Sequence, residues 1–223
     1  MGTRISFPRP DGKKAEGYLA KAGRDHAPGI VVIQEWWGLQ DQIKGMCDRL
    51  ALAGYDALAP DLYAGRAVPY HDAEAAGREM NSLNFLDATD QTMRGAARYL
   101  ARNGAKVGLT GFCMGGALTI LGAARVPEFA AGVCFYGLPP AEVAKAADVK
   151  ITLQGHFANR DDWCSPAVVD GFEKDLRKAG RKDEFFRYEA EHGFMNEQRD
   201  VHDRAAAELA WQRMLKFWPA HIG

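Results

Sequence analysis

The chain has 223 residues, a formal net charge of −1 and a hydrophobic fraction of 47%. That length suits one globular domain with a substantial core. Acidic and basic residues are interspersed, which argues against partners such as nucleic acid or an anionic membrane surface. The apolar runs are far shorter than a membrane span, and the first residues lack a signal-peptide core.

The cysteines indicate a reduced compartment. Four of them, Cys47, Cys113, Cys134 and Cys164, are scattered without a Cys-x-x-Cys pair. This pattern argues against a disulfide framework and a zinc cage, and we expect a cytoplasmic protein without metal or cofactor. Cys47 and Cys134 fall inside apolar patterns, which predicts that they lie in the core.

Strand-like and helix-like segments alternate along the chain. It opens with a hairpin signal, Asp11-Gly12, and the run at 29–34 is continuously apolar, which is typical of a strand buried on both faces. We predict strands at 5–8, 15–20, 29–34, 55–60, 106–110, 132–136, 150–154 and 184–188. We predict helices at 43–51, 72–80, 86–102, 117–124, 166–179 and 200–217. The last helix is expected to bury a face formed by Ala205, Leu209, Met214 and Trp218. The alternation predicts the α/β class: a single domain, residues 1–223, with a doubly wound, mostly parallel sheet of about eight strands.

The stretch Gly111-Phe112-Cys113-Met114-Gly115-Gly116 joins a predicted strand to a predicted helix. Gly-x-Cys-x-Gly at such a junction is the pattern of a nucleophile elbow, with cysteine in place of serine. The glycines let the backbones approach closely, and the helix N-terminus favours a thiolate at Cys113. Two alternatives stay open for these residues alone: a tightly packed crossover and a buried structural cysteine. The glycine spacing does not fit a dinucleotide fingerprint.

Polar residues follow the predicted strands at three further places: Glu35, the pair Asp161/Asp162, and His192. The carboxyl ends of parallel strands meet at one edge of a sheet, and ligands bind there. Cys113, the aspartates and His192 run in the order nucleophile, acid, histidine, which is the chain order of α/β-hydrolases. Each residue also has a structural interpretation, since Asp161/Asp162 could cap a helix and His192 could be a solvated loop residue.

The chain resembles the dienelactone hydrolases (carboxymethylenebutenolidases), a cysteine-dependent branch of the α/β-hydrolases. The matching segments span nearly the whole chain in order: Gln34-Glu35-Trp36-Trp37-Gly38, Ala59-Pro60-Asp61-Leu62-Tyr63, 111–116, Gly155-His156-Phe157 with the aspartates after it, and His192-Gly193-Phe194. The combination of the glutamate motif with a cysteine elbow is specific to this family.

The resemblance implies an α/β-hydrolase fold and a Cys113, His192, Asp161 triad that cleaves small lactones or esters through a thioester. Asp161 takes the family's acid position, with Asp162 as a near alternative. The resemblance also implies that Glu35 holds the resting thiol until substrate binds. The backbone N–H groups of Met114 and Trp36 are the expected oxyanion donors.

Substrate contacts are expected from Trp37, Arg78, Phe194 and Asn196, in a monomer or homodimer. Two alternatives stay open: Trp37 could simply pack, and Arg78 could be an exposed helical arginine. Family members that cleave dienelactone bind its carboxylate with arginines, one of them four positions after the histidine, where this chain has Asn196. The loss of a charge-assisted contact favours a neutral lactone or another ester as substrate. Another possibility is a hydrolase fold that only binds a ligand or senses oxidants through its thiol.

Overall fold

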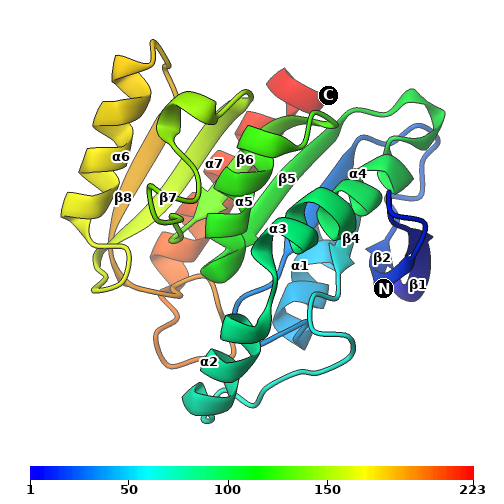
Figure 1. The fold of residues 1–223 in the computed structure, drawn as a ribbon, viewed down its shortest axis with the longest axis horizontal. Helices are drawn as coiled ribbons and strands as arrows, with labels where there is room; N and C mark the ends of the chain where they lie inside the picture. The colour runs from blue at the N-terminus through cyan, green and yellow to red at the C-terminus, as the bar shows by residue number, and fades with distance from the viewer.

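A computed structural model describes residues 1–223, except for the side chain of Asn103. Eight strands form one sheet in the order β1-β2-β4-β3-β5-β6-β7-β8 (Figure 1). The strands are β1 (Thr3–Pro8), β2 (Lys14–Ala20), β3 (Gly29–Ile33), β4 (Asp56–Pro60), β5 (Val107–Phe112), β6 (Phe129–Phe135), β7 (Thr152–Arg160) and β8 (Glu184–Glu191). β2 pairs antiparallel with β1 and β4, and every other pairing is parallel.

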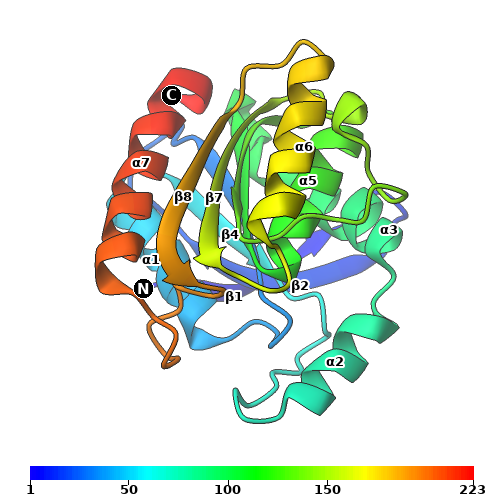
Figure 2. The same ribbon diagram turned by 90° about the vertical axis from the view of Figure 1, so that its left-hand side faces the viewer.

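Helices cover both faces of the sheet. They are α1 (Asp41–Leu52), α2 (Ala73–Ser82), α3 (Phe85–Asp87), α4 (Arg94–Leu100), α5 (Met114–Arg125), α6 (Pro166–Lys178) and α7 (Arg204–Ile222), with a π-helix at Ala88–Met93 and 3₁₀ turns at Arg102–Gly104 and Ala146–Asp148. Figure 2 shows α1 and α7 on one face and α5 and α6 on the other, while α2 lies beyond the edge at which the parallel strands end. The prediction of a doubly wound α/β domain with about eight strands is confirmed.

The core lies in two layers, one on each face of the sheet. The central strand β3 is buried along its whole length, as its unbroken apolar sequence predicts. Cys47 and Cys134 are completely buried, so their prediction as core residues is confirmed. Among the residues described, no helix combines the length and the apolar composition needed to cross a membrane.

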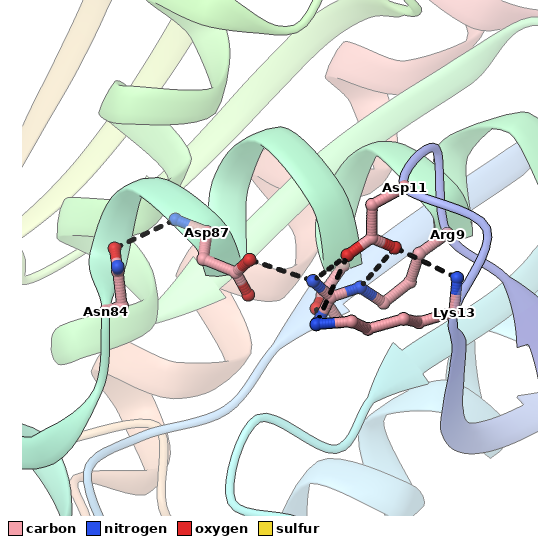
Figure 3. A network of polar contacts seen from close by, with 6 residues as sticks. Arg9, Asp11, Lys13, Asn84 and Asp87 are labelled. Atoms are coloured by element: carbon pink, nitrogen blue, oxygen red, sulfur yellow. Dashed lines mark hydrogen bonds and ion pairs between the residues drawn. The ribbon is translucent and has the colours of Figure 1, made fainter.

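Arg9 connects the β1–β2 hairpin to the helical layer through ion pairs (Figure 3). Its guanidinium bridges Asp11 in the hairpin turn at 2.7 Å and Asp87 at the end of α3 at 2.8 Å. The N–H of Asp87 in turn donates to the side chain of Asn84, which caps α3. The arginine side chain is mostly buried, so this network holds the antiparallel edge of the sheet in place.

Three predicted elements differ from the observed ones in kind or by four residues or more at one end at least, and the bounds of the other elements differ by three residues or fewer. The helix predicted at 86–102 contains the π-helix, where the Thr89 hydroxyl donates to the Phe85 carbonyl at 2.8 Å and competes with the regular helix bond. β7 does not stop at residue 154 but continues to Arg160, because β6 and β8 pair with it on both sides. The last helix starts at Arg204, after its cap Asp203, rather than at residue 200.

The buried face of α7 was predicted wrongly in its first half. Met214 and Trp218 are buried, but Ala205 is exposed and Leu209 is 47% exposed. The residues that contact the sheet there are Ala207, Ala210 and Trp211. A period of 3.6 residues places these three on the same face as Met214 and Trp218.

Candidate active site

The turn after β5 holds Cys113 in a backbone conformation that few residues other than glycine adopt. Its φ is 57° and its ψ is −118°, and the next residue, Met114, begins α5. Strain of this kind costs about 1–3 kcal/mol and persists only where neighbouring structure enforces it. The side chain is 7% exposed, at the edge of the sheet where the parallel strands end.

The glycines around Cys113 are required by close backbone contacts. A Cβ atom on Gly111 would overlap the carbonyl group of Gly115, and one on Gly115 would lie 2.5 Å from the carbonyl oxygen of Ile33. The geometry therefore agrees with the packing role that the sequence predicts for both glycines.

We expect Gly111→Ala to destabilise the fold by about 3 kcal/mol or more, because the overlap is with backbone that cannot rotate away. Gly77→Ala is the matched control, since Gly77 lies inside α2 with open space where its Cβ would be. That variant should gain about 0.5–1 kcal/mol. Urea unfolding of both variants measures the difference, and equal stabilities would contradict the packing argument.

His192 lies in the loop after β8 and contacts Asp161, which follows β7. The Nδ1 atom of His192 is 2.7 Å from Oδ2 of Asp161. The other oxygen of Asp161 accepts hydrogen bonds from the N–H groups of Trp163 and Cys164 at 2.9 and 2.8 Å. Burial opposes ionisation of Asp161, but these hydrogen bonds and the charge of His192 lower its pKa. The structure gives the histidine contact to Asp161, while Asp162 is exposed.

The Cys113 thiol lies close enough to His192 to influence the pKa of its imidazole. Burial disfavours the charged imidazole, but hydrogen bonds to Asp161 and Cys113 and the charges of both raise the pKa of His192 to about 10. Two aromatic rings pack edge-on against the imidazole, Tyr136 at 5.1 Å and Trp163 at 5.2 Å between ring centres. The three predicted triad residues are thus brought together from the ends of β5, β7 and β8.

Glu35, directly after β3 and Gln34, is 3% exposed and has both oxygens engaged. Oε2 accepts from Nδ2 of Asn196 at 2.7 Å, and Oε1 accepts from the hydroxyl of Tyr136 at 3.3 Å. Burial raises the pKa of Glu35, and Asn196, the charges of His192 and Arg199, and Tyr136 oppose that rise. The hydrogen bonds of Glu35 in this structure are with Asn196 and Tyr136, and its expected contact with the resting thiol stays a prediction.

Asn196 makes its polar contacts inside the protein. It is completely buried, with Nδ2 on Glu35 and Oδ1 accepting from the N–H of Gln198 at 3.1 Å. Both polar atoms of the buried amide are occupied by these contacts, and the expected substrate contact of Asn196 stays a prediction. In this structure Asn196 positions the Glu35 carboxylate.

We expect Asn196→Leu to lower the free energy of unfolding by about 1.5–3 kcal/mol, since Glu35 loses a charge-assisted hydrogen bond inside the protein. Asn159→Leu is the matched control, because Asn159 donates to Glu189 in an exposed pair. The control should change stability by about 0.5 kcal/mol or less. Denaturant unfolding at neutral pH compares the two, and similar losses would show that burial of the Asn196–Glu35 contact is unimportant.

Two more residues with predicted substrate contacts, Trp37 and Phe194, are buried. Trp37 is 3% exposed, and its ring lies edge-on to Trp36 and Tyr70, with centres 5.0 and 5.5 Å apart. Phe194 is completely buried against Tyr136 and Tyr188. Both residues pack among aromatic side chains, and their expected substrate contacts stay predictions.

Arg78 is not brought to the site. It lies on an exposed face of α2, where its guanidinium pairs with Glu74 one turn earlier. An exposed pair of this type contributes little to stability and needs no ligand to explain it.

Two backbone N–H groups near Cys113 are available as donors. Met114 is the first residue of α5, so its N–H has no acceptor inside the helix. The N–H of Trp36 has no partner among the hydrogen bonds of the described residues. Within those same residues, no group of three or more His, Cys, Asp or Glu side chains is arranged to hold a metal ion.

Tyr136 and Trp163 also contact the candidate site residues, although no sequence motif singled them out. Tyr136, just past the end of β6, has a positive φ of 36° and contacts both Glu35 and His192. Its place at the carboxyl end of a predicted strand, before Gly137, was a usable signal, because the other site residues were found by that same rule. Trp163 directly follows the aspartate pair and lies against His192.

The order of the strands and the turns that carry Cys113, Asp161 and His192 define an α/β-hydrolase fold. The chain belongs to the dienelactone hydrolase family: the sequence model described as "Dienelactone hydrolase family" matches residues 15–222.

Individual relatives agree with this assignment. The chain is 33% identical to "Protein usf" of Aquifex pyrophilus and 32% identical to a "Putative carboxymethylenebutenolidase" of Aquifex aeolicus, in both cases over 100% of each chain. It is also similar to a crystal structure named "Putative Dienelactone Hydrolase" from Klebsiella pneumoniae, with a TM-score of 0.87 and 28% identity over 99% of this chain and 100% of that one.

Proposed function

We propose that this protein is a cysteine-dependent hydrolase of small carboxylic esters or lactones. The observation that carries the proposal is the hydrogen-bonded pair of His192 and Asp161 beside Cys113, which sits at the strained turn before α5 and contributes to the raised pKa of His192. A core cysteine or a merely solvated loop histidine would not require this combination. Membership in a hydrolase family and the printed name of the Aquifex aeolicus relative point in the same direction.

In the proposed reaction, His192 takes the thiol proton of Cys113, and the thiolate is the nucleophile. The raised pKa of His192 favours this transfer. Asp161 fixes the orientation and tautomer of the imidazole and stabilises its charged form. The charge of His192 opposes the rise in the pKa of Glu35 that burial causes, so the charged imidazole favours the carboxylate.

The thiolate adds to the substrate carbonyl, and the oxygen that becomes negative accepts hydrogen bonds from the N–H groups of Met114 and Trp36. When the tetrahedral intermediate collapses, the carbon–oxygen bond to the alcohol breaks and His192 returns the proton to the leaving oxygen. The acyl group is then a thioester on Cys113. His192 removes a proton from water, the hydroxide attacks the thioester, and Cys113 and the carboxylic acid are released.

A stopped-flow assay with 4-nitrophenyl acetate tests the proposal. We expect a burst of about one nitrophenolate per active site, because acylation of Cys113 precedes slower hydrolysis of the thioester. Alkylation of the protein by iodoacetamide should remove the burst in proportion to the Cys113 modified. Turnover that survives complete alkylation of Cys113 would contradict the proposal and would favour a ligand-binding or redox role for the thiol.

A further inference from the structure

An apolar cavity of ≈ 570 Å³ lies beside the candidate site, outside the triad. One wall follows α5 through Met114, Ala117 and Leu121, which have the spacing of one helix face. The remaining wall comes from the end of α2, α3, the loop after β6, Trp163 and the start of α6. Its size is within the range of small-molecule sites.

The chemistry of the lining is almost purely apolar. Asn81 is its polar side chain, and among the described lining residues there is no Lys, Arg, His, Asp or Glu. A substrate carboxylate would lose its hydration here without gaining a cation, which is costly. The lining therefore favours a neutral hydrocarbon group.

The mouth of the cavity is unusual for a protein surface. Three large hydrophobic side chains, Val143, Trp163 and Val168, are 47%, 50% and 52% exposed there. Gathered apolar side chains at the surface typically mark an interaction site. Trp163 joins this mouth to the catalytic residues, because its ring lies against His192.

The direction in which the cavity extends indicates which part of an ester it would bind. Cys113 and the oxyanion donor Met114 stand at the start of α5, and the cavity continues from there along the helix. The leaving alcohol must lie toward His192, which protonates it. The group that extends along α5 is then the acyl chain. The Met114 side chain that begins this wall is held by the hydroxyl of Tyr63, 3.4 Å from its sulfur.

We propose that this cavity is an acyl-binding subsite that makes the enzyme selective for neutral esters with an extended hydrocarbon acyl chain. The inference rests on the proposed function of Cys113 and adds the substrate class to it.

A chain-length series of 4-nitrophenyl esters tests the inference. From acetate through butanoate to hexanoate, kcat/KM should rise about two- to fourfold per methylene, as expected for methylenes that leave water. A hexanoate-length ester that ends in a carboxylate should fall back to the level of acetate or below. Equal kcat/KM for acetate and hexanoate, or a preference for the carboxylate ester, would overturn the inference.

Val168→Asp places a charge in the mouth and should remove most of the gain for hexanoate, measured as the ratio of kcat/KM for hexanoate to kcat/KM for acetate. Val168 lies in the first turn of α6, where an aspartate suits the helix, so folding should be preserved. Leu209→Asp is the matched control, because Leu209 is 47% exposed on α7, away from the cavity. Identical chain-length profiles for the two variants would also overturn the inference.

Two further measurements separate the outcomes. A series of hexanoate esters with lengthening alkyl alcohols should show a smaller dependence on length, and a larger one would assign the cavity to the alcohol and contradict the acyl assignment. If hydrolysis requires Cys113 but kcat/KM does not depend on acyl chain length, the acyl subsite is contradicted and the proposed function stands. If hydrolysis persists in Cys113→Ala, the proposed function itself is contradicted.

Discussion

Cys113→Ala should lower the rate of ester hydrolysis by about 10⁴-fold or more, leaving only the residual rate that the oxyanion donors and substrate binding support. The thiol supplies the proposed nucleophile, and no shift of its neighbours replaces it. Cys47→Ala is the matched control, since Cys47 is a completely buried cysteine on α1 and lies outside the candidate site. It should lose some stability and keep its activity, so the two variants separate a catalytic thiol from a structural one.

The same position offers a second measurement that depends on the backbone alone. Because Cys113 has a φ of 57°, Cys113→Gly should relieve strain and raise the free energy of unfolding by about 1 kcal/mol while activity is lost. A thermal or urea unfolding curve decides this. A less stable Cys113→Gly variant would mean that the turn is not strained as described.

Asp161→Asn should lower kcat/KM by about 10³–10⁴-fold, because an amide cannot hold the required tautomer of His192 or stabilise its charge. Asp162→Asn is the control within the same turn. Because the carboxylate of Asp162 is exposed, this variant should change kcat/KM by about twofold or less. Equal losses in the two variants would contradict the assignment of the acid to Asp161.

The pH dependence of stability gives an independent test of the same contact. The pKa of His192 is raised to about 10 in the folded protein, above its ordinary value near 6.5. Its stabilising contribution is therefore complete below about pH 6.5 and is lost as the pH rises through about 10. Removal of the Asp161 carboxylate lowers the folded-state pKa, so the decline in stability between those values should be smaller in Asp161→Asn. Unfolding by denaturant at three pH values in this window measures both slopes.

The broad plan of the molecule was predictable because it depends on local patterns. Unbroken apolar runs identified the buried strands, and alternation with helices identified the parallel sheet. The carboxyl ends of such strands meet, so Cys113, Asp161 and His192 could be grouped before their contacts were known. The end of β7 was missed because Gly155 and His156 look like loop residues. In the sheet, His156 is buried and its ring nitrogens are paired with Tyr188 and Gln154.

The details of the site depend on contacts that spacing does not reveal. Asn196 and Glu35 are 161 positions apart, and nothing in the local sequence indicates that the amide binds the carboxylate. Trp37 and Phe194 were expected in the pocket because aromatic residues often line ligand sites. Whether neighbouring aromatic rings bury them depends on tertiary packing, which the local sequence does not reveal. The apolar surface open to a ligand lies in the cavity along α5 instead.

In the proposed reaction, Cys113 carries the acyl group of the substrate as a thioester. Acid quenching of the wild-type protein during the burst with 4-nitrophenyl hexanoate, followed by proteolysis and mass spectrometry, tests this most directly. We predict one hexanoyl group on the peptide that contains Cys113, bound as a thioester that hydroxylamine removes, and none on Cys113→Ala. A protein that turns over the ester while this peptide stays unmodified, or that carries the acyl group on another residue, would contradict the account.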